Sequence, residues 1–323
     1  MKARVILRAD GNSEIGIGHL VRSIALLGML KDDFKCVFAT RFLNPFIENE
    51  IESNGGELYK LNETSNFHYN EFLSFIKPND IVVLDNYFFN TEYQKEIKYR
   101  GCTLFCIDDI HDKHYVSDAV INHAPGISAN QFSVENYTKL YLGMDYALLR
   151  KEFFNVTPRN RSSLTKVLLC MGGADSFNIT SKLIPILQKY STIEKIDIII
   201  GSSYIHKNSL NQTIKNSPIE IKIFSNLSAK EMVDIMQAND FAILPASTVC
   251  LEALAVGIPF IVGYTVDNQK ELYQTLTRLN KIPGVGDFTN CDSFPLEELG
   301  LLNKNFKPLS SKNLISIFKN YAG

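Results

Sequence analysis

A histidine at the start of a predicted helix is the first candidate for chemistry in this chain of 323 residues. His19 ends the polar, glycine-bearing stretch 8–19, which follows an apolar run at 5–7 and precedes helical spacing over 20–27. The positive end of a helix dipole disfavours imidazolium, so we expect a neutral imidazole that can act as a general base. A histidine that only caps the helix, without chemistry, is the alternative that this position leaves open.

Glycines and hydroxyls follow two predicted strands in the second half of the chain. Gly172 and Gly173 come directly after the strand predicted at 166–171, where main-chain amides can approach a phosphate or simply form a tight turn. Ser247 and Thr248 begin a helix after the strand predicted at 241–244, and its first turn has unpaired N–H groups that suit a diphosphate.

A carboxylate lies one turn further into that helix. Glu252 is four residues after Thr248 and therefore on the same face. It precedes the apolar run 253–256, in which an unpartnered carboxylate would be costly, so we expect it to accept hydrogen bonds from the hydroxyls of a ribose. An ordinary helix cap with a solvated glutamate is the alternative. The next strand, predicted at 259–263, leads to the polar cluster Asp267-Asn268-Gln269.

Polar side chains also follow two strands of the first half. Asp85-Asn86-Tyr87 ends the strand predicted at 81–85, and Asp108-Asp109 follows the strand at 103–107. His111 and His114 lie nearby, but no predicted helix places them on one face and no cysteine pair supports them, so we predict no metal site. Three other histidines are interpreted as surface or hydrogen-bonded loop residues: His68, His123 and His206.

Short β-branched runs alternate with helical patterns along nearly the whole chain, which predicts an α/β protein with parallel sheets covered on both faces. The polar, non-periodic stretch 157–163 is interpreted as a linker. We therefore predict two doubly wound Rossmann-like domains, 1–156 and 164–303, followed by a tail, 304–323, that is helical over 312–321 and packs back on one domain. Such domains bind ligands at the carboxyl ends of their strands, here in a cleft between the domains.

The composition narrows the class of protein. A formal net charge of -2 gives no electrostatic reason to expect nucleic acid or an anionic membrane as a partner. The six cysteines are scattered through apolar patterns, as buried reduced thiols would be. Neither a signal peptide nor an uninterrupted apolar stretch of about 20 residues is evident. We expect a cytoplasmic monomer that needs no cofactor.

The combined motifs resemble one family, the UDP-2,4-diacetamido-2,4,6-trideoxy-β-L-altropyranose hydrolases of pseudaminic acid biosynthesis, which are relatives of GT-B glycosyltransferases. The resemblance covers roughly residues 3 to 275. It departs from the family at Asn86, where the family usually has histidine, and at Ala174, where threonine or serine is commoner. The matching segments, in the order of the family, are Arg8-Ala9-Asp10, Ile15 to His19 with Arg22, Asp85-Asn86-Tyr87, Asp108-Asp109, Tyr146 to Arg150, Met171 to Asp175, Ser247 to Glu252 and Asn268-Gln269.

The resemblance implies a GT-B arrangement of the two domains and hydrolysis at the anomeric carbon. Amides and a helix dipole can stabilise the departing UDP, so we expect no obligatory metal, and water that attacks opposite UDP would invert the anomeric centre. His19 would be the base that activates water, UDP would lie on the second domain, and Tyr87 would line the sugar pocket. It implies a substrate-binding role for the following residues: Arg8, Asp10, Gly18, Arg22, Tyr87, Gly173, Ser247, Thr248, Glu252, Asn268 and Gln269.

Three other functions remain open on the sequence. A GT-B glycosyltransferase would use the same UDP site with an acceptor hydroxyl in place of water. A hydrolysing 2-epimerase would exchange the C2 hydrogen of its substrate with solvent. A nucleotide-sugar binding protein without catalysis would use His19 only as a ligand contact.

Overall fold

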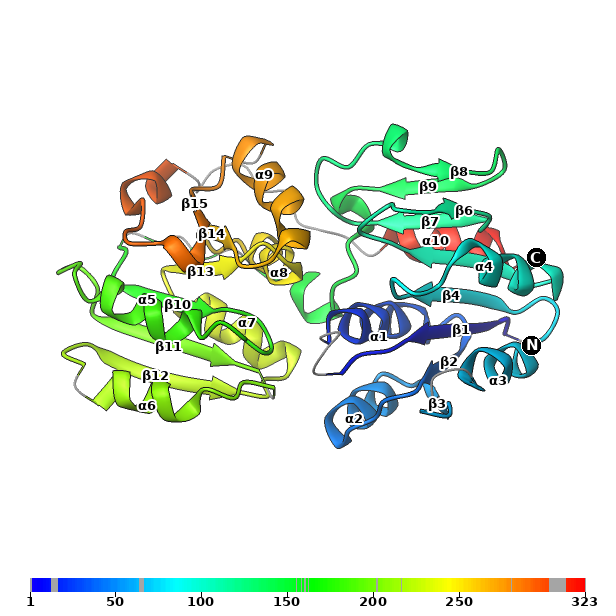
Figure 1. Cartoon of the computed structure of the whole chain (residues 1–323), viewed down its shortest axis with the longest axis horizontal. Helices are drawn as coiled ribbons and strands as arrows, with labels where there is room; N and C mark the ends of the chain where they lie inside the picture. The colour runs from blue at the N-terminus through cyan, green and yellow to red at the C-terminus, as the bar shows by residue number, and fades with distance from the viewer. Residues whose placement is uncertain are drawn as a thin grey trace. The chain divides into compact units, whose positions relative to one another are not determined.

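The computed structural model describes residues 2–12, 17–63, 67–154, 156–157, 159, 161, 163–201, 203–215, 217–279, 281–301 and 312–322. The chain forms two compact units (Figure 1): unit 1 comprises Met1–Lys151 and Leu309–Gly323, and unit 2 comprises Glu152–Pro308. The division at 151 and 152 precedes the linker that composition predicts. Residues 13–16 of the loop before His19, and several linker residues, lie outside the described part of the chain.

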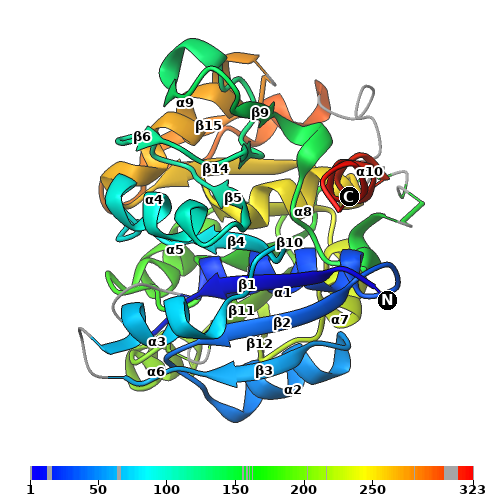
Figure 2. The same ribbon diagram turned by 90° about the vertical axis from the view of Figure 1, so that its right-hand side faces the viewer.

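In the described part of unit 1, the central sheet has seven parallel strands in the order β3-β2-β1-β4-β5-β7-β9. Figure 2 shows β4, β1, β2 and β3 side by side in this sequence. The strand bounds are Arg4–Ala9 (β1), Lys35–Thr40 (β2), Glu57–Lys60 (β3), Ile81–Asp85 (β4), Thr103–Ile107 (β5), Ala119–Asn122 (β7) and Lys139–Leu142 (β9), while His114–Tyr115 (β6) and Ser133–Val134 (β8) pair separately.

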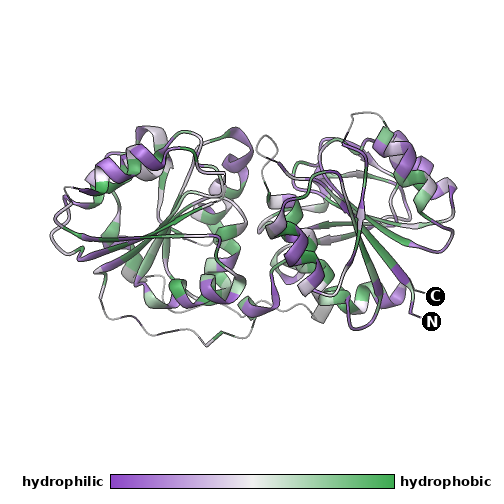
Figure 3. Ribbon diagram, turned by 90° about the horizontal axis from the view of Figure 1, so that it is seen from below, coloured by the Kyte–Doolittle hydropathy of each residue, from purple (hydrophilic) through white to green (hydrophobic). Residues whose placement is uncertain are grey.

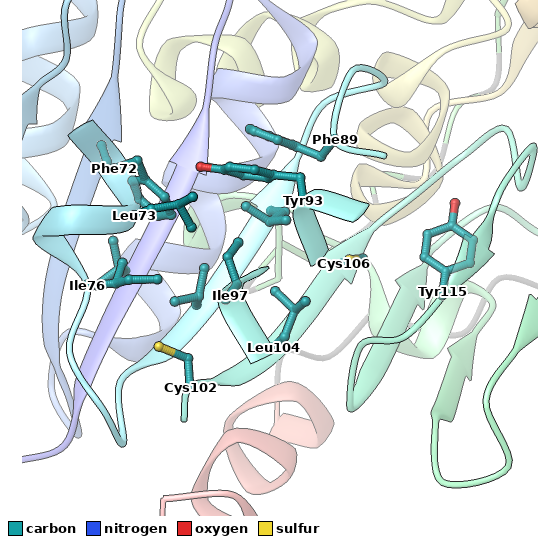
Figure 4. Packing of buried hydrophobic residues seen from close by; sticks show 14 of the residues in the cluster. Phe72, Leu73, Ile76, Phe89, Tyr93, Ile97, Cys102, Leu104, Cys106 and Tyr115 are labelled. Atoms are coloured by element: carbon teal, nitrogen blue, oxygen red, sulfur yellow. The ribbon is translucent and has the colours of Figure 1, made fainter. Parts of the chain in front are cut away.

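Helices cover both faces of this sheet, because its strands are apolar on both sides. One face packs on α3 and α4, and Figure 4 shows Phe72 and Ile97 from these helices over Leu104 of the sheet. On the other face, Phe318 of α10 stacks on Phe105, with ring centroids 4.4 Å apart. The helices are Gly18–Leu30 (α1), Pro45–Ser53 (α2), Phe67–Phe75 (α3), Thr91–Tyr99 (α4) and Lys312–Asn320 (α10), with 3-10 helices Ala129–Gln131 (η1), Met144–Tyr146 (η2) and Lys151–Phe154 (η3).

Unit 2 repeats the architecture with a parallel sheet in the order β12-β11-β10-β13-β14-β15. Its strands are Lys166–Cys170 (β10), Lys195–Ile200 (β11), Glu220–Ser225 (β12), Phe241–Pro245 (β13), Phe260–Tyr264 (β14) and Gly284–Asp287 (β15). Its helices are Ile179–Leu187 (α5), Lys207–Lys215 (α6), Ala229–Ala238 (α7), Thr248–Val256 (α8) and Lys270–Leu279 (α9), with 3-10 helices Asp267–Gln269 (η4), Phe288–Asn290 (η5) and Leu296–Leu301 (η6).

Both sheets therefore have the strand order of a doubly wound Rossmann fold, and in Figure 3 each lies between two layers of helices with mostly hydrophobic strands. The predicted fold class, α/β with two Rossmann-like domains, is confirmed. The strand order reverses between β1 and β4 in unit 1 and between β10 and β13 in unit 2. In such sheets, ligands bind outside the carboxyl ends of the strands at this point of reversal.

Candidate active site

His19 is the second residue of α1, at the carboxyl edge of the unit 1 sheet. Its imidazole is buried, with 5% of the residue exposed, and its Nδ1 lies 2.7 Å from Oδ1 of Asp85, the last residue of β4. The helix start that the sequence predicts is therefore present. The pairing with Asp85 joins residues from α1 and β4 that are far apart in the chain, because β4 is the neighbour of β1 in the sheet.

Asp85 is completely buried and receives hydrogen bonds from α1. Arg22 donates to it from Nε at 2.8 Å and from Nη2 at 2.5 Å, and the Ser23 hydroxyl donates at 2.9 Å. Burial alone would raise the pKa of this carboxyl, but the charges and hydrogen bonds of Arg22 and His19 outweigh it and hold the pKa well below the usual range. Asp85 is therefore a carboxylate.

A carboxylate can only accept hydrogen bonds, so the Nδ1 of His19 must carry the proton. Arg22 Nη2 lies 3.0 Å from the same Nδ1. Because Nδ1 carries a proton, Nη2 does not donate to the ring, and both groups donate to Oδ1 of Asp85. In a neutral imidazole this tautomer leaves Nε2 with a free lone pair. The arrangement matches the histidine–aspartate part of a catalytic triad, in which the acid fixes the tautomer of the base.

Two further side chains complete this network. The Tyr87 ring meets the His19 ring edge to face, with centroids 4.6 Å apart. Its hydroxyl donates to Asp109 Oδ2 at 3.3 Å, and Arg22 Nη1 donates to the same oxygen at 2.9 Å. Burial and the Asp109 charge raise the pKa of Tyr87, so the phenol keeps its proton. The structure thus brings together three predicted residues, His19, Arg22 and Tyr87.

Arg8 and Asp10, also predicted to bind substrate, form a separate network on the opposite face of the sheet. Their side chains are fully buried and make a bidentate ion pair at 2.7 and 2.8 Å, which Arg41 extends by donating to Asp10 from Nε at 2.6 Å. Hydrogen bonds and charges from Arg8 and Arg41 overcome the effect of burial and lower the pKa of Asp10 to about 2. In this structure these residues hold the strand end, and direct contact with substrate stays a prediction.

Asn86 follows Asp85 in the chain, but its side chain binds the Asp10 network: its Oδ1 accepts a hydrogen bond from the Asp10 backbone N–H at 2.6 Å. His68 completes the Asp10 network from α3, with Nδ1 3.2 Å from an Arg8 nitrogen. It is 1% exposed and helical, so its interpretation as a surface or loop residue is wrong. An isolated histidine on a short helix gives no sequence signal of such burial.

The first turn of α1 is open toward solvent. Gly18 is exposed, and a side chain built there would meet no atom within 4 Å. The preceding residue, Ile17, makes no side-chain cap hydrogen bond to the helix. The first-turn N–H groups next to His19 are therefore placed where a ligand can approach.

In unit 2, the turn after β10 is built by glycines. Gly172 has a positive φ of 84°, and the neighbouring Gly173 is exposed. Gly201, at the end of β11, approaches so closely that a Cβ there would lie 2.1 Å from the Gly173 carbonyl oxygen. Asp175 then caps α5 by accepting from Ile179 and Thr180 N–H groups at 2.7 and 2.8 Å. Sequence reasoning identified Gly173 but missed Gly201.

The neighbouring strand ends carry the remaining predicted residues. Ser247 precedes the first turn of α8, makes no side-chain cap hydrogen bond and is half-buried, like Thr248. Glu252 is buried within α8. After β14, Asn268 is exposed, and Gln269 closes its own loop by accepting from the Thr265 N–H at 2.9 Å. Because β10, β13 and β14 are neighbours, all these residues lie at one edge of the unit 2 sheet.

The described ranges hold neither a cluster of metal ligands nor a helix that could span a membrane. No group of three or more histidine, cysteine, aspartate or glutamate side chains there is arranged to hold a metal ion. None of the helices in the same ranges combines the length and apolar character that a membrane span needs.

No protein-family model matches the chain, but individual proteins do. The chain is 25% identical over 273 residues to the UDP-2,4-diacetamido-2,4,6-trideoxy-β-L-altropyranose hydrolase of Campylobacter jejuni. The aligned residues cover 83% of this chain and 93% of that protein. The predicted resemblance is confirmed.

Two other relatives match the chain over similar lengths. Identity to an uncharacterised protein of Methanocaldococcus jannaschii is 28% over 283 residues, 84% of this chain. The chain matches 57% of the length of that archaeal protein. Identity to SpsG, a spore coat polysaccharide biosynthesis protein of Bacillus subtilis, is 25% over 277 residues, covering 83% of this chain and 79% of the relative.

Solved structures show the same fold. MurG of Acinetobacter baumannii superposes with a TM-score of 0.66 at 11% identity, covering 99% of this chain and all of MurG. HepE of Anabaena, solved with UDP and glucose, gives a TM-score of 0.59 at 11% identity, with 99% of each chain covered. These likenesses confirm the fold of GT-B glycosyltransferases and, at such identities, carry no conclusion about substrate.

Proposed function

We propose that the protein is a UDP-sugar-processing enzyme, and more narrowly a hydrolase that cleaves the anomeric C–O bond of a UDP-linked 2,4-diacetamido-2,4,6-trideoxy sugar with inversion. The products would be UDP and the free sugar, and the place of the reaction would be pseudaminic acid biosynthesis for a surface glycan. The observation that carries the proposal is the buried His19–Asp85 pair beside Tyr87. The similarity to the Campylobacter hydrolase supports the choice of substrate.

In the proposed reaction, His19 accepts a proton at Nε2 from water as the oxygen attacks C1 of the sugar. Asp85 stabilises the imidazolium that forms, because its carboxylate accepts the Nδ1–H at 2.7 Å. The bond between C1 and the diphosphate oxygen breaks as the water oxygen bonds to C1 from the opposite side, through an oxocarbenium-like state. The pair of electrons of the broken bond leaves with UDP.

The leaving group would be held by unit 2. Amides of the Gly172–Gly173 turn and the first turn of α8 supply hydrogen bonds and a positive helix end for the departing diphosphate. Ser247 and Thr248 would add hydroxyls, Glu252 would hold the ribose, and Asn268 and Gln269 would meet the sugar. UDP is a good leaving group, so this stabilisation can suffice without a general acid.

A glycosyltransferase is the second candidate, because the structural neighbours with the same fold include MurG. It would use the same UDP site and would need an acceptor hydroxyl in place of water. The two functions differ in whether UDP is released when no acceptor is present.

The test incubates the full chain with a panel of UDP-linked diacetamido sugars in ¹⁸O-labelled water, without an acceptor. We expect UDP release and one ¹⁸O atom in the free sugar, because water attacks carbon. Label in UDP would mean attack on phosphorus and would contradict the proposal. Release that depends on an added acceptor alcohol would favour the glycosyltransferase, and stable binding of every sugar nucleotide without turnover would favour a binding protein.

A further inference from the structure

Three side chains form a row beyond the carboxyl ends of adjacent strands in unit 1. Leu84 of β4 pairs with Cys106 of β5, and Ile107 of β5 pairs with Ile121 of β7. Tyr87, Asp109 and His123 follow these three strand ends in the same order: the Tyr87 hydroxyl binds Asp109, and His123 lies close enough for the Arg22 and Asp109 charges to act on it. The Asp108 N–H donates to the Ile121 carbonyl at 3.1 Å, so the β5–β7 pairing continues to this row.

The row lies on the face that α1 covers, next to the proposed base. Asp85, two residues before Tyr87, binds His19, and Asp109 binds Arg22 of the same helix. The edge-to-face contact between Tyr87 and His19 places the row one side chain away from the imidazole. A substituent of a sugar bound at His19 is therefore within reach of the row.

Asp109 contributes an acceptor with unused capacity. Its Oδ2 accepts from both Arg22 and Tyr87, whereas its Oδ1 is covered and has no hydrogen-bond partner among the described residues. A buried carboxylate oxygen without a donor costs free energy, which a ligand N–H or O–H would recover. The side chain as a whole is 35% exposed although Oδ1 is covered, so a small rotation of the carboxyl group would bring this oxygen to a ligand.

His123 contributes a donor. Its Nδ1 accepts the Leu148 backbone N–H at 3.2 Å, so in the neutral ring the proton is on Nε2. Burial, with the Arg22 charge as a smaller cause, lowers the pKa of His123 to about 4, and the ring is therefore neutral at pH 7. The tautomer is the reverse of the one at His19, which keeps its Nε2 lone pair.

We propose that the Tyr87–Asp109–His123 row binds an acylamino substituent of the sugar. Asp109 Oδ1 would accept the amide N–H, and His123 Nε2–H would donate to the acyl carbonyl, while Tyr87 holds Asp109 in place. An acylamino group carries one fixed donor and one fixed acceptor, which matches this pair of protein groups. The inference rests on the proposed function and names the residues that would select its substrate class.

The test compares two ligands that differ only in this substituent: the UDP-linked 2,4-diacetamido-2,4,6-trideoxy sugar and the UDP-linked 6-deoxy sugar with hydroxyls at C2 and C4. Affinities are measured by calorimetry in the His19→Ala background, so that turnover does not consume the ligand. Asp109→Asn is the first variant. Its carbonyl oxygen will face the two donors Arg22 and Tyr87, which leaves an NH₂ group where the amide N–H must bind.

We expect Asp109→Asn to weaken binding of the diacetamido ligand by ~10- to 100-fold, the range for a lost hydrogen bond to a charged group. The dihydroxy ligand should change by less than about threefold, because a hydroxyl can accept as well as donate. His123→Asn should have the same selective effect. Its Oδ1 can replace Nδ1 as the acceptor for Leu148, so the variant deletes only the Nε2–H group.

Asp112→Asn and His114→Asn are matched controls, because both residues lie on the surface near the row and are paired elsewhere. The inference would be overturned if the Asp109 and His123 variants lost affinity equally for both ligands or lost none. It would also be overturned if the His19→Ala protein bound the two ligands with equal affinity. Binding of neither ligand would overturn it together with the proposed function. Selective binding without any turnover by the unsubstituted chain would overturn only the hydrolase.

Discussion

Asp85 connects the residues on which the proposed chemistry depends. It is a fully buried carboxylate at the end of a central strand, and the side chains that donate to it, His19, Arg22 and Ser23, all come from α1. It therefore fixes both the position and the tautomer of the imidazole. Arg22 supplies the balancing charge and is shared with Asp109, so a single guanidinium joins the base to the proposed sugar-binding row.

A double-mutant cycle tests the coupling of Asp85 to His19. His19→Ala should lower kcat by ~10²–10⁴-fold, the usual contribution of a general base, and leave the affinity for UDP unchanged. Asp85→Asn should lower kcat over the same range, because an amide that donates to Nδ1 moves the ring proton to Nε2. The double variant should be no slower than His19→Ala alone.

Multiplicative losses in the double variant would mean that Asp85 acts independently of the imidazole. A His19→Ala protein with more than a tenth of the original kcat would remove His19 from the mechanism. Both variants remove a member of the buried network around Arg22, so either could also destabilise the fold. Free energies of unfolding, measured in urea for each variant, separate a catalytic loss from a folding defect.

The sequence led to His19 as the proposed base but could not predict its partner. The position of His19 follows from local signals, a glycine-bearing loop and a helix start, and these need no tertiary information. Whether Asp85 or Asp10 faces His19 depends on which side of the sheet each strand end presents. A shift of one residue moves a side chain to the opposite face, so Arg8 and Asp10 are near His19 in sequence but belong to another network.

Gly201 shows how one strand shapes the end of its neighbour. Its backbone approaches the Gly173 carbonyl so closely that no side chain fits between β11 and the turn after β10. The turn that would bind the diphosphate is thus set by contact with an adjacent strand and not by its own two glycines alone. Gly201 therefore shapes the proposed UDP site through the Gly172–Gly173 turn and need not contact the ligand itself.

Gly201→Ala tests this dependence. The added methyl group must displace the Gly172–Gly173 turn, and a misplacement of about 1 Å can weaken an oriented interaction by ~10- to 100-fold. We expect a loss of UDP affinity in that range, measured by calorimetry, with a fall in the free energy of unfolding of about 1–3 kcal/mol. Unchanged UDP binding by a folded Gly201→Ala protein would separate the turn from the UDP site.

Strands in the middle of the two sheets are the elements that the sequence predicts best. The predicted bounds of β4 and β5, 81–85 and 103–107, agree with the structure, and so do those predicted for β7, 119–122. Each of these strands is a mostly apolar run buried on both faces. The two edge strands β9 and β15 were missed. Residues of β9 are mostly half-buried, and β15 is Gly284-Val285-Gly286-Asp287, so neither has the run of buried apolar residues that marks a strand.

The two ends of the chain together complete unit 1. The terminal helix α10 buries Phe318, which contacts Phe34 and Phe105 of the same unit, and Lys319 pairs with Asp33 at 2.8 Å. The sequence predicted a helical tail but gave no means of choosing its domain, because a short amphipathic helix fits many apolar surfaces. Unit 1 is therefore built from two segments that lie far apart in the chain.

Unit 1 should also lose stability in mild acid, because it holds two neutral histidines in buried sites. Burial lowers the pKa of both His68 and His123 to about 4 in the folded protein, against 6.5 for a free imidazole. Between these values the unfolded chain binds more protons than the folded chain, so the free energy of unfolding falls as the pH is lowered. The full contribution is present above pH 6.5 and is lost as the pH falls toward 4.

His123→Asn isolates one of these contributions. From pH 7.5 to pH 5.0 a histidine with such a shift costs about 2 kcal/mol, so the variant should lose that much less stability over this range than the unsubstituted chain. Asp10, with a pKa of about 2, stays charged throughout and does not contribute. The chain contains no tryptophan, so urea unfolding is followed by circular dichroism at both pH values. An identical pH dependence in the two proteins would mean that His123 is protonated, or solvated, in the folded state, and would remove the neutral donor from the proposed sugar-binding row.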